Sequence, residues 1–213
     1  QMQRIKFTRE GGKDIVLMNW QGHPTGHGSY HNSIMSYSGK VVEAVEEQLD
    51  CHMLYFTGAS GNVDPSSRIN SENITADYWE QGEFMAAEAE LAMDSMKKEE
   101  LGKLQCVHRD VEVMAKGKPT DFPICGITIG DVAFVTAPYE MFNGRGEYIK
   151  ENSPFDITFI STVSNGGKGY IPTEETFEYG GYEVSRCNYD KGTAEKLAEG
   201  YVALLKELYD SRK

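Results

Sequence analysis

The sequence predicts an α/β fold in which a mixed β-sheet is layered with helices. Short apolar runs, which are typical of buried strands, alternate along the chain with segments of helical periodicity. Turn-forming residues between neighbouring apolar runs indicate hairpins, so part of the sheet should be antiparallel. The 213 residues contain no internal repeat and no linker, so residues 1–213 are expected to form a single domain.

In the first half of the chain, a hairpin is expected from RIKFTRE and IVLMNW, which flank the turn-like GGKD. It is followed by a helix near 38–49, a strand at 51–58 and a long helix from about Thr75 to Lys98. Thr75 is the candidate N-cap of the long helix. The inward faces of the two helices are predicted from their apolar stripes: Val41, Val42, Val45 and Leu49 for the first, and Phe84, Ala87 and Leu91 for the second.

The second half should add strands at 104–115, at 123–139 around the turn Gly130-Asp131, and at 156–165. Residues 141–151 are predicted to be helical. The stretch 166–189 is rich in glycine and tyrosine and lacks periodicity, which favours a long loop. A last helix at about 193–210 carries an apolar stripe of Leu197, Leu204, Leu205 and Leu208.

The composition argues against several classes of partner. A formal net charge of −12, from 33 acidic and 21 basic residues, opposes nucleic acid and anionic lipid surfaces. There is no apolar run of the length that a transmembrane helix needs. The four cysteines, at 51, 106, 125 and 187, form no CxxC pair, which excludes a zinc ribbon or thioredoxin motif. Cys51 and Cys125 lie in apolar runs and are predicted to be buried thiols. Because the chain has an even number of cysteines, disulfides stay open.

A histidine-rich stretch, NWQGHPTGHGSYH, places His23, His27 and His31 four residues apart. On a helix this spacing would put the imidazoles on one face, but the glycines and the proline between them argue against a helix. The stretch instead begins where a predicted strand ends, which is a common position for binding residues. Each histidine is therefore either a metal ligand or a solvated loop residue.

Four segments are expected to meet at strand ends: 19–31, 57–68, 136–145 and 164–186. Each offers one oxygen or nitrogen ligand, namely His23, Asp64, Glu140 and Tyr170. Zinc hydrolases use three or four such donors and leave room for water. For Glu140 the competing interpretation is a solvated carboxylate at a helix N-terminus.

Serine catalysis is an alternative. TGASGN resembles the GxSxG nucleophile elbow at Gly58 and Ser60, but Asn62 occupies the position of the second glycine. Ser60 is therefore kept as a second candidate nucleophile.

Four stretches, in order along the chain, resemble the catalytic domain of the neutral/alkaline non-lysosomal ceramidase family, zinc amidases that hydrolyse the amide of N-acylsphingosine. NWQGHPT is similar to the family segment that ends in His-Pro-Thr, GNVDP to its Gly-Asp-Val-Ser-Pro segment, and APYEMFNGRG to its Pro-Gly-Glu segment. GYIPTEETFEYGGYEV resembles the loop that carries two active-site tyrosines. The resemblance implies that this chain is the latter part of a ceramidase-like catalytic domain.

The resemblance also implies roles for particular residues. It makes His23, Glu140 and Tyr170 zinc ligands and Tyr182 a second active-site tyrosine, whereas His27 and His31 match no family ligand. Asp64 stands where the family has its serine, and it is expected to act in catalysis by handling a proton. A further zinc-ligating histidine and a substrate-binding arginine of the family would precede Gln1, so the Zn²⁺ site in this fragment should be incomplete.

The function expected from these points is that of a zinc-dependent amidohydrolase acting on a linear amide, with a small-molecule or lipid amide as substrate. The replacement of serine by Asp64 supports an alternative, a catalytically inactive domain with a binding or assembly role. Association with the missing N-terminal portion or with a second copy is expected, because a sheet edge would otherwise be exposed. A secreted and a cytoplasmic bacterial location both stay open, since a missing N-terminal part could carry a signal.

Overall fold

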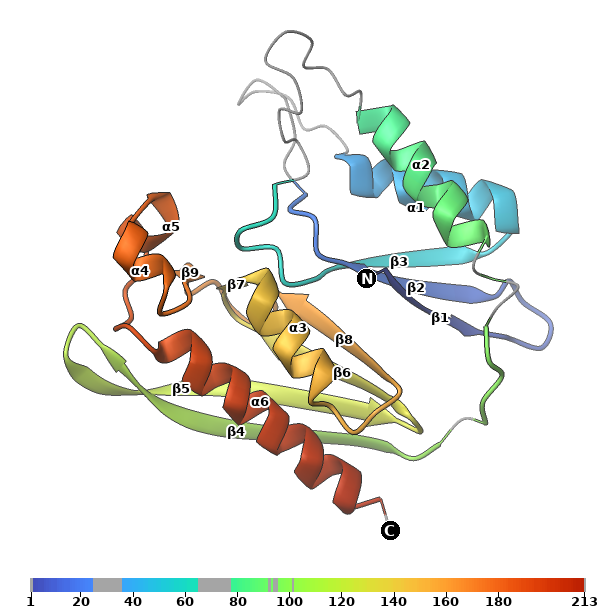
Figure 1. Ribbon diagram of the computed structural model, residues 1–213. Helices are drawn as coiled ribbons and strands as arrows, with labels where there is room; N and C mark the ends of the chain where they lie inside the picture. The colour runs from blue at the N-terminus through green and yellow to red at the C-terminus, as the bar shows by residue number, and fades with distance from the viewer. Residues whose placement is uncertain are drawn as a thin grey trace, which may run out of the picture. The chain divides into compact units, whose positions relative to one another are not determined.

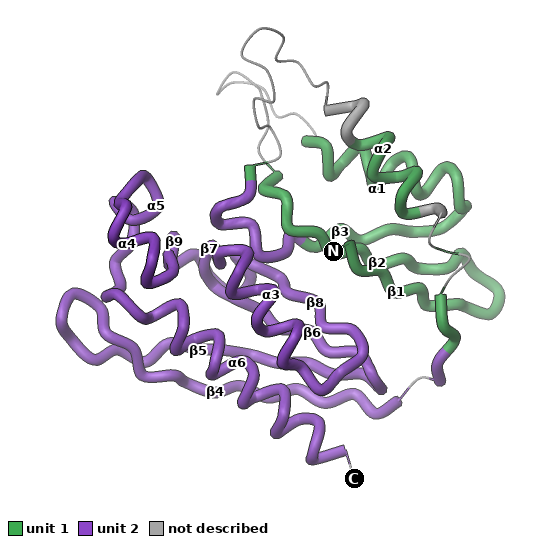
Figure 2. The backbone as a smooth tube through the Cα atoms, in the orientation of Figure 1, with its two compact units in different colours: residues 1–56, 64–98 green, residues 57–63, 99–213 purple. Residues whose placement is uncertain are grey.

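The computed structural model describes residues 2–24, 36–64, 78–91, 93, 96–100 and 102–212. The chain divides into two compact units, shown in two colours in Figure 2. Unit 1 consists of Gln1–Phe56 and Asp64–Lys98, and unit 2 of Thr57–Val63 and Glu99–Lys213. The single domain expected for residues 1–213 stays a prediction.

Unit 1 contains a three-stranded sheet in the order β1-β2-β3 (Figure 1). β1 (Gln3–Phe7) and β2 (Ile15–Trp20) form the predicted antiparallel hairpin, and β3 (His52–Thr57) pairs with β2. Two helices complete the unit, α1 (Tyr37–Leu49) and α2 (Tyr78–Leu91). Val41 and Val45 of α1 are buried, as the apolar stripe predicts.

The predicted inner face of α2 is wrong. Phe84 is 66% exposed and Ala87 is exposed, whereas Met85, Ala86 and Ala89 are buried. Gly82 lies on the same side as these three, and a Cβ there would come 2.6 Å from the Lys40 side chain of α1. Small residues therefore allow α2 to pack closely on α1. Two neighbouring faces of α2 are apolar, so periodicity alone could not distinguish them. The helix also ends at Leu91, before the predicted Lys98, and Thr75 lies outside the described residues.

Unit 2 is built on a four-stranded mixed sheet in the order β4-β5-β6-β8. Its strands are β4 (Leu104–Ala115), β5 (Lys118–Ile129), β6 (Val132–Ala137) and β8 (Ile157–Thr162). The first two pairings are antiparallel and the β6–β8 pairing is parallel. The predicted mixed sheet with helices is therefore confirmed.

Two helices, α3 (Asn143–Glu151) and α6 (Thr193–Asp210), cover the same face of this sheet (Figure 1). Gly126 of β5 lies under Leu204 and Leu208 of α6, and Ile160 of β8 lies under Gly146 of α3. The sheet register places Gly126 and Ile160 in one row, through Val135 of β6. The predicted leucine stripe of α6 is confirmed, because Leu197, Leu204, Leu205 and Leu208 are all buried.

Short elements occupy the stretch 166–189, where a long loop is predicted. β9 (Tyr170–Ile171) pairs with β7 (Glu140–Met141), and α4 (Thr176–Tyr179) and α5 (Tyr182–Ser185) follow. Elements of two to four residues are too short to produce a periodic pattern, which explains the difference.

All four cysteines are free thiols, and Cys51 and Cys125 are buried as predicted. In the part of the chain that the structure describes, no helix has both the length and the apolar character needed to cross a membrane.

Candidate active site

Two of the predicted metal ligands face each other on the short parallel strands β7 and β9. The register pairs Glu140 with Tyr170 and Met141 with Ile171. Met141 and Ile171 are fully buried in the core of unit 2 and anchor the two strands. Because side chains alternate along a strand, Glu140 and Tyr170 share the opposite face. Two backbone hydrogen bonds at the N-terminal end of these strands hold the pair: Glu140 N donates to Gly169 O at 2.9 Å, and Lys168 N donates to Pro138 O at 2.7 Å.

Glu140 and Tyr170 also interact through their side chains. The phenol of Tyr170 donates a hydrogen bond to the carboxylate of Glu140. Burial raises the pKa of Tyr170 well above its usual value, and the hydrogen bond and negative charge of Glu140 raise it further. The phenol therefore keeps its proton across the physiological range. A carboxylate and a phenol oxygen that lie this close can bind one cation together.

Tyr182, the second predicted tyrosine, lies against Tyr170. The two ring centroids are 5.7 Å apart in an edge-to-face arrangement. Tyr182 begins α5, is 58% exposed, and carries the guanidinium of Arg186 over its ring. Its hydroxyl is thus on a residue that is positioned by ring packing and still accessible to a ligand.

Gly61 and Asn62, the first two residues of the GNVDP stretch, pack directly on β7 and the start of α3. Gly61 N donates to Met141 O at 2.7 Å, and a Cβ on Gly61 would come 2.7 Å from the carbonyl oxygen of Glu140. Asn62 Oδ1 accepts a hydrogen bond from Asn143 N at 2.8 Å, at the start of α3. Only glycine allows this close approach, which explains the residue type at position 61.

Ser60 does not have the geometry of a nucleophile elbow, whose hydroxyl must be exposed. It is only 2% exposed. This burial disfavours the serine-hydrolase alternative.

A backbone feature of this region was not anticipated from the sequence. Val163, directly after β8, has a φ of 53° in the left-handed region, which is unfavourable for a β-branched residue. Its N–H donates to Tyr139 O at 3.3 Å, and the next residue, Ser164, donates to Ala137 O at 3.0 Å. Strained residues of this kind cluster at functional sites, and this one adjoins the segment that leads to Glu140.

A pocket of about 480 Å³ lies beside the same segments. Its lining includes Asn62, Phe142, Arg145, Thr176, Tyr179 and Glu195. Three of the four segments that were expected to meet thus contribute to one region of unit 2, the first of them through its described residues 57–63 and the others through 136–145 and 164–186.

The remaining predicted site residues belong to unit 1. His23 follows β2, and its Nδ1 is shielded from solvent. Gly22 precedes His23 and has no room for a Cβ, because the ring of Trp20 and the hydroxyl of Tyr37 lie too close. The Tyr37 hydroxyl also donates a hydrogen bond to Gly22 O at 2.5 Å. Asp64 directly follows Val63 and is exposed. Membership of His23 and Asp64 in the site of Glu140 stays a prediction, and His27 and His31 lie outside the described residues.

The sequence reasoning missed a second cluster of potential ligands. Cys106, His108 and Cys125 bring their sulfur and nitrogen atoms within 4.8 Å of one another. The signal was present as a Cys-x-His pair on a predicted strand, but the third residue is supplied only by the pairing of β4 with β5.

Comparisons with solved structures identify the same fold elsewhere. The neutral ceramidase from Pseudomonas aeruginosa matches with a TM-score of 0.76 and 15% identity, over 97% of this chain and 46% of that chain. A ceramidase complexed with C2 matches with a TM-score of 0.80 and 14% identity, over 99% of this chain and 48% of that chain. No protein-family model and no curated protein sequence matches the chain.

The chain therefore has a ceramidase-like fold and spans about half the length of the solved ceramidase chains. The matched region is the latter part of the solved chain, as the sequence motifs imply. This confirms the predicted fold class.

Proposed function

We propose that this chain is part of a zinc-dependent hydrolase of the neutral ceramidase type, which cleaves a linear N-acyl amide bond. The observation that carries the proposal is the hydrogen-bonded pair of Glu140 and Tyr170, with Tyr182 packed against it, in a chain of ceramidase-like fold. The proposed substrate is a small-molecule or lipid amide.

The residues fit a zinc ion by the chemistry of their donors. Carboxylate oxygen, phenol oxygen and imidazole nitrogen are ligands that zinc accepts, and Glu140, Tyr170 and His23 would supply them. When bound, zinc would polarise the scissile carbonyl and lower the pKa of a water molecule.

The proposal gives a role to four of the predicted site residues: Tyr170, Glu140, Asp64 and Tyr182. Tyr170 would hold the ion as a phenolate, with its proton released to solvent, and Glu140 would hold it through a carboxylate oxygen. Asp64 holds the proton taken from the attacking water and later returns it to the leaving amine. Tyr182 donates a hydrogen bond to the carbonyl oxygen as negative charge develops on it.

Zinc-loaded full-length protein should be assayed with N-acylsphingosine and with a shorter N-acyl amine. Asp64→Asn should lower kcat by on the order of 100-fold, because general acid–base groups contribute about that much. Glu140→Gln should lower activity at least as much, because it removes a proposed zinc ligand. Glu147→Gln on α3, an exposed carboxylate, is the matched control and should keep full activity. Full activity in Glu140→Gln would reject the proposed role of the pair.

A second function is supported by Asp64 itself, because it stands where the similar family has serine. In that case the domain binds an amide ligand without turning it over. Turnover in the wild type that is lost in Asp64→Asn with the fold intact supports the enzyme. Ligand binding that is equal in wild type and Asp64→Asn, with turnover in neither, supports the binding domain.

A further inference from the structure

One face of the β4–β5 hairpin carries a group of soft metal ligands. Cys106 and His108 are two residues apart on β4, so their side chains leave the strand on the same side. The antiparallel register places Cys125 of β5 directly opposite His108, with Cys106 diagonal to it. The sheet pairing thereby brings Cys125 into contact with Cys106, from which it is separated by 19 positions in the sequence.

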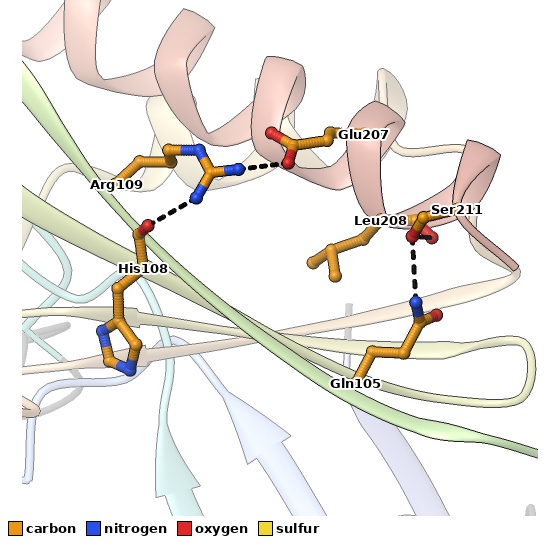
Figure 3. A network of polar contacts seen from close by, with 6 residues as sticks. All are labelled: Gln105, His108, Arg109, Glu207, Leu208 and Ser211. Carbon is orange, nitrogen blue, oxygen red and sulfur yellow. Dashed lines mark hydrogen bonds and ion pairs between the residues drawn. The ribbon is translucent and has the colours of Figure 1, made fainter.

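This face is the one turned away from α6. Arg109, the neighbour of His108, reaches the carboxylate of Glu207 on α6, and Gln105 Nε2 donates to Ser211 Oγ at 2.9 Å. Figure 3 shows the imidazole of His108 pointing away from that helix. Cys106 and His108 are exposed, so a metal ion can reach them from solvent, whereas Cys125 forms the buried floor.

The distances within the group match those around a single small cation. Cys106 Sγ and Cys125 Sγ each lie 3.7 Å from His108 Nε2, and the two sulfur atoms are 4.0 Å apart. Zinc bonds of about 2.3 Å to sulfur and about 2.0 Å to nitrogen require ligand atoms to be separated by roughly 3.5–4.0 Å at tetrahedral to trigonal angles. The three atoms therefore need almost no movement to bind one ion.

The chemistry of the ligands selects the class of ion. Two thiolates and an imidazole prefer thiophilic ions such as Zn²⁺ and discriminate against Mg²⁺ and Ca²⁺. Asp110 and Glu112, at the next alternate positions of β4, are exposed and add negative charge to this side of the strand. That charge favours a cation over an anion.

We propose that Cys106, His108 and Cys125 form a binding site for a thiophilic divalent metal ion, separate from the proposed hydrolase site and independent of that function. With three protein ligands and two of them exposed, the ion keeps one coordination position open for water or for a ligand from a partner molecule.

The test is a titration of the full chain with Cd²⁺ under reducing conditions, followed by competition with Zn²⁺. Cadmium bound to thiolate absorbs in the ultraviolet, and none of the proposed hydrolase ligands is a cysteine, so this signal separates thiolate binding from binding at the hydrolase site. One equivalent of Cd²⁺ should develop the full absorption, and Zn²⁺ should remove it.

Two variants at exposed positions identify the ligands without disturbing the buried Cys125. Cys106→Ser should lose the absorption of one thiolate and weaken binding by tenfold or more, since even groups that only orient a ligand contribute about that much. His108→Gln should retain both thiolates but bind with a similarly reduced affinity. Cys187→Ser, which removes a thiol from another part of unit 2, should behave as wild type.

Two results would overturn the proposal, provided that circular dichroism shows each variant to be folded. One is the absence of cadmium–thiolate absorption when the reduced wild-type chain is titrated. If the oxidised chain then shows a disulfide between Cys106 and Cys125, the two thiols form a redox pair and not a metal site. The other is unchanged affinity in both Cys106→Ser and His108→Gln.

Discussion

At the scale of single residues, the candidate site depends on a few side chains that the local backbone brings into contact. Tyr170 illustrates this dependence. Burial and the neighbouring Glu140 raise its pKa, so the isolated phenol resists losing its proton. A bound cation has the opposite effect, because it stabilises the phenolate. The contact with Glu140 thus raises the pKa of Tyr170 and also places its phenol oxygen beside a carboxylate, where both could ligate one zinc ion.

Tyr170→Phe removes one proposed ligand and leaves the ring packing intact. In a chain that also carries Cys106→Ser and His108→Gln, we expect the affinity for zinc to fall by on the order of 10- to 100-fold, with little change in thermal unfolding, as judged by isothermal titration calorimetry and circular dichroism. Tyr179→Phe is the matched control, because Tyr179 is 79% exposed and belongs to the neighbouring α4. Equal affinities in the two variants would remove Tyr170 from the ligand set.

Gly61→Ala tests the close approach between the 58–63 segment and β7. The new Cβ would meet backbone atoms of Glu140 and Met141, which cannot move as a side chain can. We expect the free energy of unfolding in urea to fall by roughly 1–3 kcal/mol. Gly144→Ala, which has open space around its position in α3, should range from neutral to about 1 kcal/mol more stable. The packing argument fails if both variants have the same stability.

At the scale of elements, the strands and long helices could be predicted because each has a periodic pattern. β4 occupies residues 104–115 as predicted, and α6 buries its leucine stripe. The α2 face was wrong because Gly82 and the small residues beside it, and not the large Phe84, set the contact with α1. A choice between two apolar faces depends on the partner helix, which a local pattern does not contain.

Helix α3 contains a lysine whose burial affects stability. Desolvation lowers the pKa of Lys150 to about 8, against the weaker opposing influence of Glu147. Between about pH 8 and the ordinary lysine pKa of 10.5, the unfolded chain binds more protons than the native chain. Lys150 therefore makes the free energy of unfolding rise with pH in that window. Below about pH 8 the folded protein carries the full penalty of a partly buried charge.

Lys150→Met should therefore be more stable than wild type at pH 7, and its advantage should shrink as the pH rises through 8 toward 10.5. Urea unfolding of both proteins at several pH values measures this difference. Lys196→Met, at an exposed position of α6, should show no such trend. A stability difference for Lys150→Met that is constant with pH would contradict the assignment.

At the scale of the whole molecule, the candidate site could be predicted only in part. The motifs around His23, Asp64, Glu140, Tyr170 and Tyr182 resemble one family, and the structure brings Glu140, Tyr170 and Tyr182 together in unit 2. His23 and Asp64 lie in unit 1, so their part in the site is still a prediction. The cysteine–histidine group was missed because Cys125 joins it through sheet register, which depends on pairing between distant strands.

The most direct test of the central claim is zinc binding by calorimetry to the full chain that carries Cys106→Ser and His108→Gln, so that the second candidate site is removed. We predict that one zinc ion binds, and that adding Glu140→Gln or His23→Ala abolishes the binding while Glu147→Gln leaves it unchanged. No binding in the starting protein, or binding that survives both Glu140→Gln and His23→Ala, would contradict the assignment of these residues as a zinc site.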